Sequence, residues 1–83
     1  MRAGADEKDI SEVNEAIAYF QRALRIRPDD AQAHNNLGAI LFQVGRVPEA
    51  ILHLEQRLRL KPGDANAHYG LGTALLELGK VPA

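Results

Sequence analysis

The sequence predicts an all-α fold of antiparallel helix-turn-helix repeats, an α-solenoid with about two 34-residue repeat equivalents and four helices. Three observations predict it. Pro28 and Pro62 are 34 positions apart, and so are Pro48 and Pro82. Aligning residues 27–49 on residues 61–83 at this offset gives 11 identities in 23 positions. Between the prolines, apolar residues recur every three or four positions, which is the spacing of one helix face.

The first helix is expected over residues 6–27. No glycine or proline occurs between Ala5 and Arg27, and apolar residues in this stretch step by three and four positions. Residues 14–28 also match residues 48–62 at the 34-residue offset. Each repeat consists of a first-type helix followed by a second-type helix. Because residues 48–62 form the second half of a repeat, the first helix of the chain is interpreted as a lone second-type helix.

A complete repeat is expected over residues 30–63. Asp30 stands at the N-cap of a first-type helix over residues 31–44, which Gly45 ends. Pro48, a residue favoured in the first turn of a helix, begins a second-type helix that runs to Leu60. A proline and a glycine then stop that helix.

The fourth helix, expected over residues 65–78, repeats the first-type helix, with Asp64 at its N-cap and Gly79 at its end. The chain is thus interpreted as a single repeat domain, residues 1–83, whose residues 64–83 begin a further repeat. Gly38 and Gly72 occupy equivalent positions inside the two first-type helices. Because glycine there costs roughly 1 kcal/mol relative to alanine, close approach of a partner helix is expected at both.

Composition excludes several functional classes. The chain has 10 basic and 11 acidic residues, so its net charge of −1 provides no field that attracts nucleic acid. No run approaches the roughly 18 apolar residues of a membrane span, and residues 1–9 are too polar for a signal peptide. We expect no nucleic-acid or membrane partner, and the compartment stays open, with the cytoplasm favoured. The basic residues of the second-type helices are expected on a solvated convex face: Arg22, Arg25, Arg27, Arg57, Arg59 and Lys61.

Neither a metal site nor a catalytic site is predicted. His34 and His68 lie one repeat apart, but neighbouring helices are about 8–10 Å apart, too far for two imidazoles to share an ion. With His53 they are interpreted as half-buried residues in aromatic slots, and the chain contains no cysteine. No serine near a histidine, phosphate-binding glycine loop or pair of converging carboxylates is present, so no enzyme activity and no cofactor are expected.

The repeat resembles the tetratricopeptide repeat (TPR) family. The family pattern is an aromatic-x-x-Leu-Gly-x-x-Tyr first helix, an Ala-x-x-x-Phe second helix and a closing proline. In the complete repeat these positions hold His34, Leu37, Gly38, Leu41, Ala50, Leu54 and Pro62. Two departures stand out: histidine replaces the large aromatic residue, and Arg57 occupies a slot where the family prefers a small residue.

The resemblance implies a protein-protein interaction scaffold that binds a peptide or protein through its concave face, which the first-type helices line. The candidate binding residues on that face are Asn35, Asn36, Phe42, Gln43, Asn66, Tyr69, Thr73 and Glu77. This neutral, amide-rich surface suits hydrogen bonding to an extended peptide, as an asparagine at the place of Asn36 does in several family members. The alternative interpretation leaves Asn35 and Asn36 merely solvated. Members that clamp a carboxylate need basic residues where this chain has Asn66 and Gly70, so that activity is not expected.

A self-assembling structural unit is the second functional hypothesis. A lone second-type helix on one chain and a final first-type helix on another can complete a repeat between them. The expected contact residues are Ile17, Phe20 and Leu24 on one chain and Leu71, Leu75 and Leu78 on the next. A homo-oligomer is therefore expected, with a dimer favoured because the long first helix can also pair with its own copy. A third interpretation is the scaffold segment of a larger enzyme, such as a glycosyltransferase or sulfotransferase.

Overall fold

A computed structural model describes residues 3–79, with side chains described from Ser11 onward. Four helices follow one another along the chain: α1 (Ala3–Ile26), α2 (Ala31–Gln43), α3 (Val47–Leu60) and α4 (Ala65–Gly79). Within residues 3–79 there is no strand, which confirms the all-α expectation. The largest difference from the expected bounds is at α1, which begins at Ala3 and includes Gly4. None of these helices combines the length and apolar character that a membrane-spanning segment requires.

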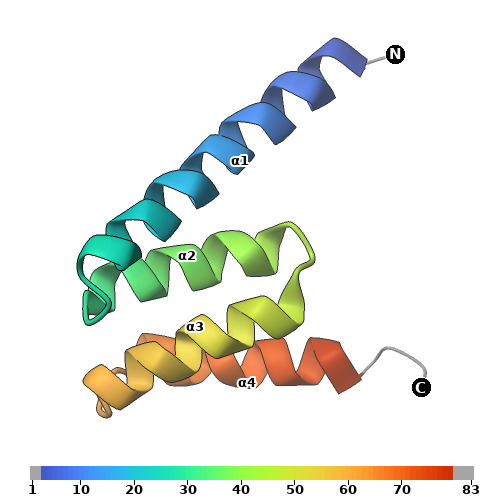
Figure 1. The fold of residues 1–83 in the computed structure, drawn as a ribbon. Helices are drawn as coiled ribbons and strands as arrows, with labels where there is room; N and C mark the ends of the chain where they lie inside the picture. The colour runs from blue at the N-terminus through green and yellow to red at the C-terminus, as the bar shows by residue number, and fades with distance from the viewer. Residues whose placement is uncertain (1–2, 80–83) are drawn as a thin grey trace.

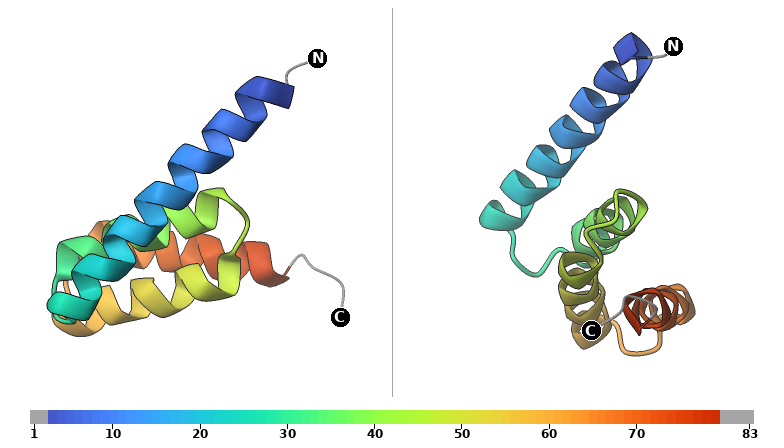
Figure 2. Two further views of the ribbon diagram at one scale, coloured as in Figure 1. Left: turned by 45° about the horizontal axis from the view of Figure 1, so that its top comes forward. Right: turned by 90° about the vertical axis from the view of Figure 1, so that its right-hand side faces the viewer.

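The helices alternate in direction, and α2, α3 and α4 form one stack (Figure 1). The right-hand view of Figure 2 looks along these three helices and shows α1 lengthwise, at an angle to them. The apolar residues through which α1 packs against the stack are Val13, Ile17, Phe20 and Leu24. The N-terminal part of α1 projects beyond α2 in all three views.

An aspartate starts each first-type helix. Oδ1 of Asp30 accepts a hydrogen bond from the backbone N–H of Ala33 at 3.1 Å, and Oδ1 of Asp64 accepts one from that of Ala67 at 3.3 Å. These bonds satisfy amides that have no partner within the helix, so both capping predictions are confirmed. The turn between α2 and α3 contains Gly45 at φ 85°, a left-handed conformation that glycine adopts without steric penalty.

Two apolar clusters form the core. The first joins α1, α2 and α3 through Ile17, Leu37, Leu41 and Ala50. The second joins α3 and α4 through Ile51, Leu54 and Ala74. The face of α2 that carries Leu37 and Leu41 is fully covered, whereas Leu75 and Leu78 of α4 are 50% and 40% exposed. The stack thus covers α2 from both sides and α4 from one side.

The two equivalent glycines lie in different surroundings. A Cβ atom at Gly38 would be 3.2 Å from Cγ of Leu54, so α3 approaches α2 closely there and the expectation is confirmed. A Cβ atom at Gly72 would have nothing within 4 Å among the described residues. The expectation of a close partner helix at Gly72 is therefore wrong for this part of the chain. The physical reason is that no described helix covers the face of α4 that corresponds to the α3-facing side of α2.

Candidate functional site

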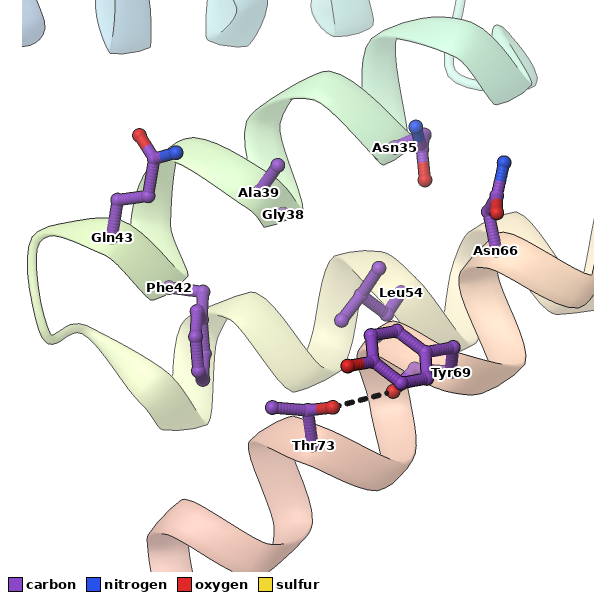
Figure 3. A pocket seen from close by; sticks show the side chains of 10 residues that line it. Asn35, Gly38, Ala39, Phe42, Gln43, Leu54, Asn66, Tyr69 and Thr73 are labelled. Carbon is purple, nitrogen blue, oxygen red and sulfur yellow. Dashed lines mark hydrogen bonds between the residues drawn. The ribbon is translucent and has the colours of Figure 1, made fainter.

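A hollow of about 310 Å³ opens between α2 and α4, with α3 beneath it (Figure 3). Its lining consists of Asn35, Gly38, Ala39, Phe42, Gln43, Leu54, Asn66, Tyr69, Gly70 and Thr73. All ten lining residues are uncharged. The hollow, called the groove below, therefore offers hydrogen-bonding and apolar surface but no ion-pairing group.

The floor of the groove is apolar because the largely buried Leu54 lies beneath two glycines, which place no side chain above it. A Cβ atom at Gly70 would lie 3.6 Å from both Cδ atoms of Leu54, and one at Gly38 would lie 3.2 Å from its Cγ. A side chain at Gly70 would be in ordinary contact with Leu54, whereas one at Gly38 would crowd it. Phe42 extends the apolar surface toward the other end of the groove (Figure 3).

Polar groups stand at both ends of the groove. Asn35 of α2 and Asn66 of α4 lie close together at one end, and Gln43 lies at the other (Figure 3). Tyr69 is 78% exposed at the rim, and its backbone carbonyl accepts a hydrogen bond from the Thr73 hydroxyl at 2.9 Å. The arrangement thus places amide donors and acceptors on either side of an apolar centre.

Six of the eight candidate binding residues line the groove: Asn35, Phe42, Gln43, Asn66, Tyr69 and Thr73. Asn36 and Glu77 are not among its lining residues, and the Oδ1 of Asn36 accepts a hydrogen bond from Nε2 of Gln32 at 3.4 Å. Sequence reasoning missed the contributions of Gly38 and Leu54. Gly38 and Gly70 lie on either side of Leu54 only in the folded structure, so their positions in the sequence did not indicate this part of the groove.

The comparison with known families agrees with this geometry. A family model described as TPR repeat matches residues 7–45 and 38–79. This chain belongs to the TPR repeat family. TPR repeats are in general protein-protein interaction modules, and no enzyme family was found for the chain. No curated protein matches it.

Two histidines of the complete TPR repeat meet between α2 and α3. Nδ1 of His34 lies 3.1 Å from Nδ1 of His53, and Nε2 of His34 lies 2.7 Å from the carbonyl oxygen of Pro28. Because a carbonyl only accepts, Nε2 of His34 carries a proton and donates it. In a neutral His34, Nδ1 is then the acceptor, and Nδ1–H of His53 donates to it.

This pair differs from the one considered in the sequence, His34 and His68. Burial, and after it the neighbouring His34, lowers the pKa of His53. Among the residues that the structure describes, no group of three or more histidine, cysteine or acidic side chains is placed to hold a metal ion. His68 repeats half of the arrangement, because its Nε2 lies 2.8 Å from the carbonyl oxygen of Pro62. The histidine in the aromatic slot of this TPR sequence thus hydrogen-bonds to the turn that follows the preceding helix.

Arg57 does not lie on the solvated convex face, and that expectation is wrong for this residue. Its Nε donates to Oδ2 of Asp64 at 2.5 Å, and the two side chains are only 14% and 12% exposed. The hydrogen bond from Arg57 lowers the pKa of Asp64. Since Asp64 also caps α4, this departure from the small residue of the TPR pattern ties the end of α3 to the start of α4.

Proposed function

We propose that the groove between α2 and α4 binds an extended segment of a protein or peptide partner. The observation that carries the proposal is the combination of an apolar floor, formed by Leu54 and Phe42 beside two glycines, with amides at both ends. A binding segment would place an apolar side chain over Leu54 and Phe42. Its backbone would exchange hydrogen bonds with Asn35, Asn66 and Gln43.

The two kinds of contact have different weights. Full burial of a leucine-sized or phenylalanine-sized side chain contributes about 1.5–3 kcal/mol, whereas each backbone hydrogen bond contributes a net ~0.5–1.5 kcal/mol. The apolar anchor therefore sets most of the affinity, and the amides set the direction and register of the segment. Because no lining residue is charged, the affinity should change little between about 0.05 and 0.5 M salt.

The test begins with selection of linear peptides from a random phage-displayed library on the immobilised chain. Selected peptides are then titrated by fluorescence polarisation against wild type, Tyr69→Ala and Asn35→Ala. Tyr69 is 78% exposed, so its truncation leaves the core intact while it removes one wall of the groove. We expect about tenfold weaker binding by Tyr69→Ala and a smaller loss by Asn35→Ala.

Tyr19→Ala is the matched control, because Tyr19 is 64% exposed on α1, away from the groove. Its affinity should equal that of wild type. Asn36→Ala shows in addition whether the bound segment extends past the groove toward α1. Peptides that bind Tyr69→Ala as tightly as wild type, or that lose affinity only with Tyr19→Ala, would place the binding site elsewhere.

A further inference from the structure

We propose that the uncovered face of α4 binds α1 of a second copy of this chain, in the arrangement that α3 adopts on α2. The 34-residue repeat relates the helices in pairs: α4 corresponds to α2, and α1 corresponds to α3. Contacts between α2 and α3 therefore predict contacts between α4 and α1 of the second copy. Each predicted contact can be checked for chemical fit.

The face of α4 is apolar and open. Leu75, which corresponds to the fully buried Leu41, is 50% exposed, and Leu78 is 40% exposed. A Cβ atom at Gly72 would have nothing within 4 Å, although the equivalent Gly38 lies against α3. The space that α3 fills on α2 is thus empty on α4 within the described residues.

The complementary face of α1 is also incompletely covered. Ala50 of α3 is fully buried against α2, but its counterpart Ala16 on α1 is only partly buried. Phe20, the counterpart of Leu54, is likewise partly buried. Ile17 is 5% exposed and already belongs to the core of its own chain, so it is not part of this surface.

The first transferred contact joins a glycine to a large apolar side chain. Gly38 lies against Leu54, and the offset turns this pair into Gly72 and Phe20 of the second copy. A glycine on α4 leaves room for the bulkier phenylalanine. Size and polarity therefore fit at the centre of the proposed interface.

The second transferred contact joins a hydrogen-bond acceptor to a donor. His34 meets His53, and the offset turns this pair into His68 and Tyr19 of the second copy. Nε2 of His68 donates to the carbonyl of Pro62, which leaves Nδ1 as an acceptor. The phenolic O–H of Tyr19, on a side chain that is 64% exposed, is a donor that matches it.

Arg46 and Glu49, which pair at 2.6 Å, both lie at the start of α3, so their ion pair is a contact within one helix and is not transferred to the proposed interface. Both transferred pairs are chemically compatible, and this agreement selects α1 of a second copy as the occupant.

The proposed contact is heterologous, because each copy contributes two different surfaces, α1 to one neighbour and α4 to the other. Two substitutions test them separately. Gly72→Glu fills the open space on α4, and Ala16→Glu places a charged side chain on the partly buried face of α1. Circular dichroism establishes that both variants remain helical, and sedimentation velocity measures their mass at concentrations up to about 100 μM.

We expect the wild type to exceed its monomer mass of 9.1 kDa as its concentration rises, and each variant alone to remain monomeric. An equimolar mixture should form dimers and nothing larger, because the Ala16→Glu copy keeps an intact α4 and the Gly72→Glu copy keeps an intact α1. Tyr69→Ala, which alters only the groove, should assemble as the wild type does. The two proposals can thus fail independently.

Three results overturn the proposal. One is a wild type that remains at 9.1 kDa throughout. Another is a mixture of the two variants that stays monomeric. The third is a dimer that persists in Gly72→Glu, because it would come from α1 pairing with its own copy and not from contact with α4.

Discussion

Alanine substitutions at the two equivalent glycines should affect stability in different directions. Gly38 and Gly72 both lie inside first-type helices, 34 positions apart. Alanine is favoured over glycine in a helix interior by roughly 1 kcal/mol. Because nothing lies within 4 Å of a Cβ atom at Gly72, Gly72→Ala should obtain this gain in full. Its free energy of unfolding should rise by about 1 kcal/mol.

At Gly38 the same gain is opposed by overpacking. The new Cβ atom would lie 3.2 Å from Cγ and 3.3 Å from Cδ2 of Leu54. Leu54 is 5% exposed and packs with Ile51 and Ala74, so it cannot retreat without disturbing the second core cluster. Overpacking of a core costs about 1–3 kcal/mol. After the helical gain is subtracted, Gly38→Ala should leave the free energy of unfolding between unchanged and about 2 kcal/mol lower.

Urea denaturation followed by far-ultraviolet circular dichroism measures the difference. The protein concentration is kept below the range in which the wild type assembles, because assembly would add its own stabilisation. In a domain of this size each kcal/mol also shifts the melting temperature by about 4–8 °C. If Gly38→Ala stabilised the chain as much as Gly72→Ala, the close contact between α2 and α3 at Leu54 would not exist, and the reasoning would be refuted.

Two acid-dependent effects should follow from the titrating groups. The pKa of Asp64 lies below its ordinary value of 3.8 because of the Arg57 hydrogen bond, so the stabilisation it provides is present above that pH and is lost as the pH falls through the folded-state pKa. Compared with Asp64→Asn by urea denaturation, the wild type should keep its advantage at neutral pH and lose it in strong acid; an advantage that persists in acid contradicts the ion pair. The pKa of His53 lies below its ordinary value of 6.5 through burial, so the wild type should lose stability as the pH falls below 6.5. His53→Gln, which can still donate to His34, should have a flatter stability profile, and an equally steep profile would show that another group titrates.

The fold could be predicted from the sequence because its signals are local and repeated. The proline spacing sets the length of the repeat, and Asp30 and Asp64 mark helix starts through hydrogen bonds that span three residues. The start of α1 was less predictable. Gly4 does not end the helix, since a single glycine lowers helix stability without preventing helix formation.

The groove was partly predictable for a related reason. Helical periodicity determines which side chains of α2 and α4 share a face, and so it indicated Asn35, Phe42 and Tyr69 without knowledge of the packing. It did not indicate the floor, because Leu54 comes from another helix and reaches the groove between two glycines that carry no side chain. Repetition could not reveal the contact between His34 and His53 either, because Tyr19 replaces histidine at the position that corresponds to His53.

Arg57 shows how a departure from a family pattern can be explained by tertiary structure. Its counterpart in the preceding half repeat is Ala23, and the N-cap that follows Ala23 is Asp30. Both caps bind their helix, but among the described residues only Asp64 also receives an arginine Nε–H, at 2.5 Å. The α3–α4 connection therefore has an ionic link that the α1–α2 connection lacks.

The two proposed surfaces are separable because α4, the one helix that contributes to both, contributes different residues to each. On α4 the groove residues Tyr69 and Thr73 are four positions apart and share one face. Gly72 and Leu75 are not among the residues that line the groove. A Cβ atom at Gly72 would have nothing within 4 Å among the described residues, so it would not touch the groove residues. The two proposals together therefore predict that a partner segment and a second copy of the chain bind α4 at the same time, and that each surface can be removed without loss of the other.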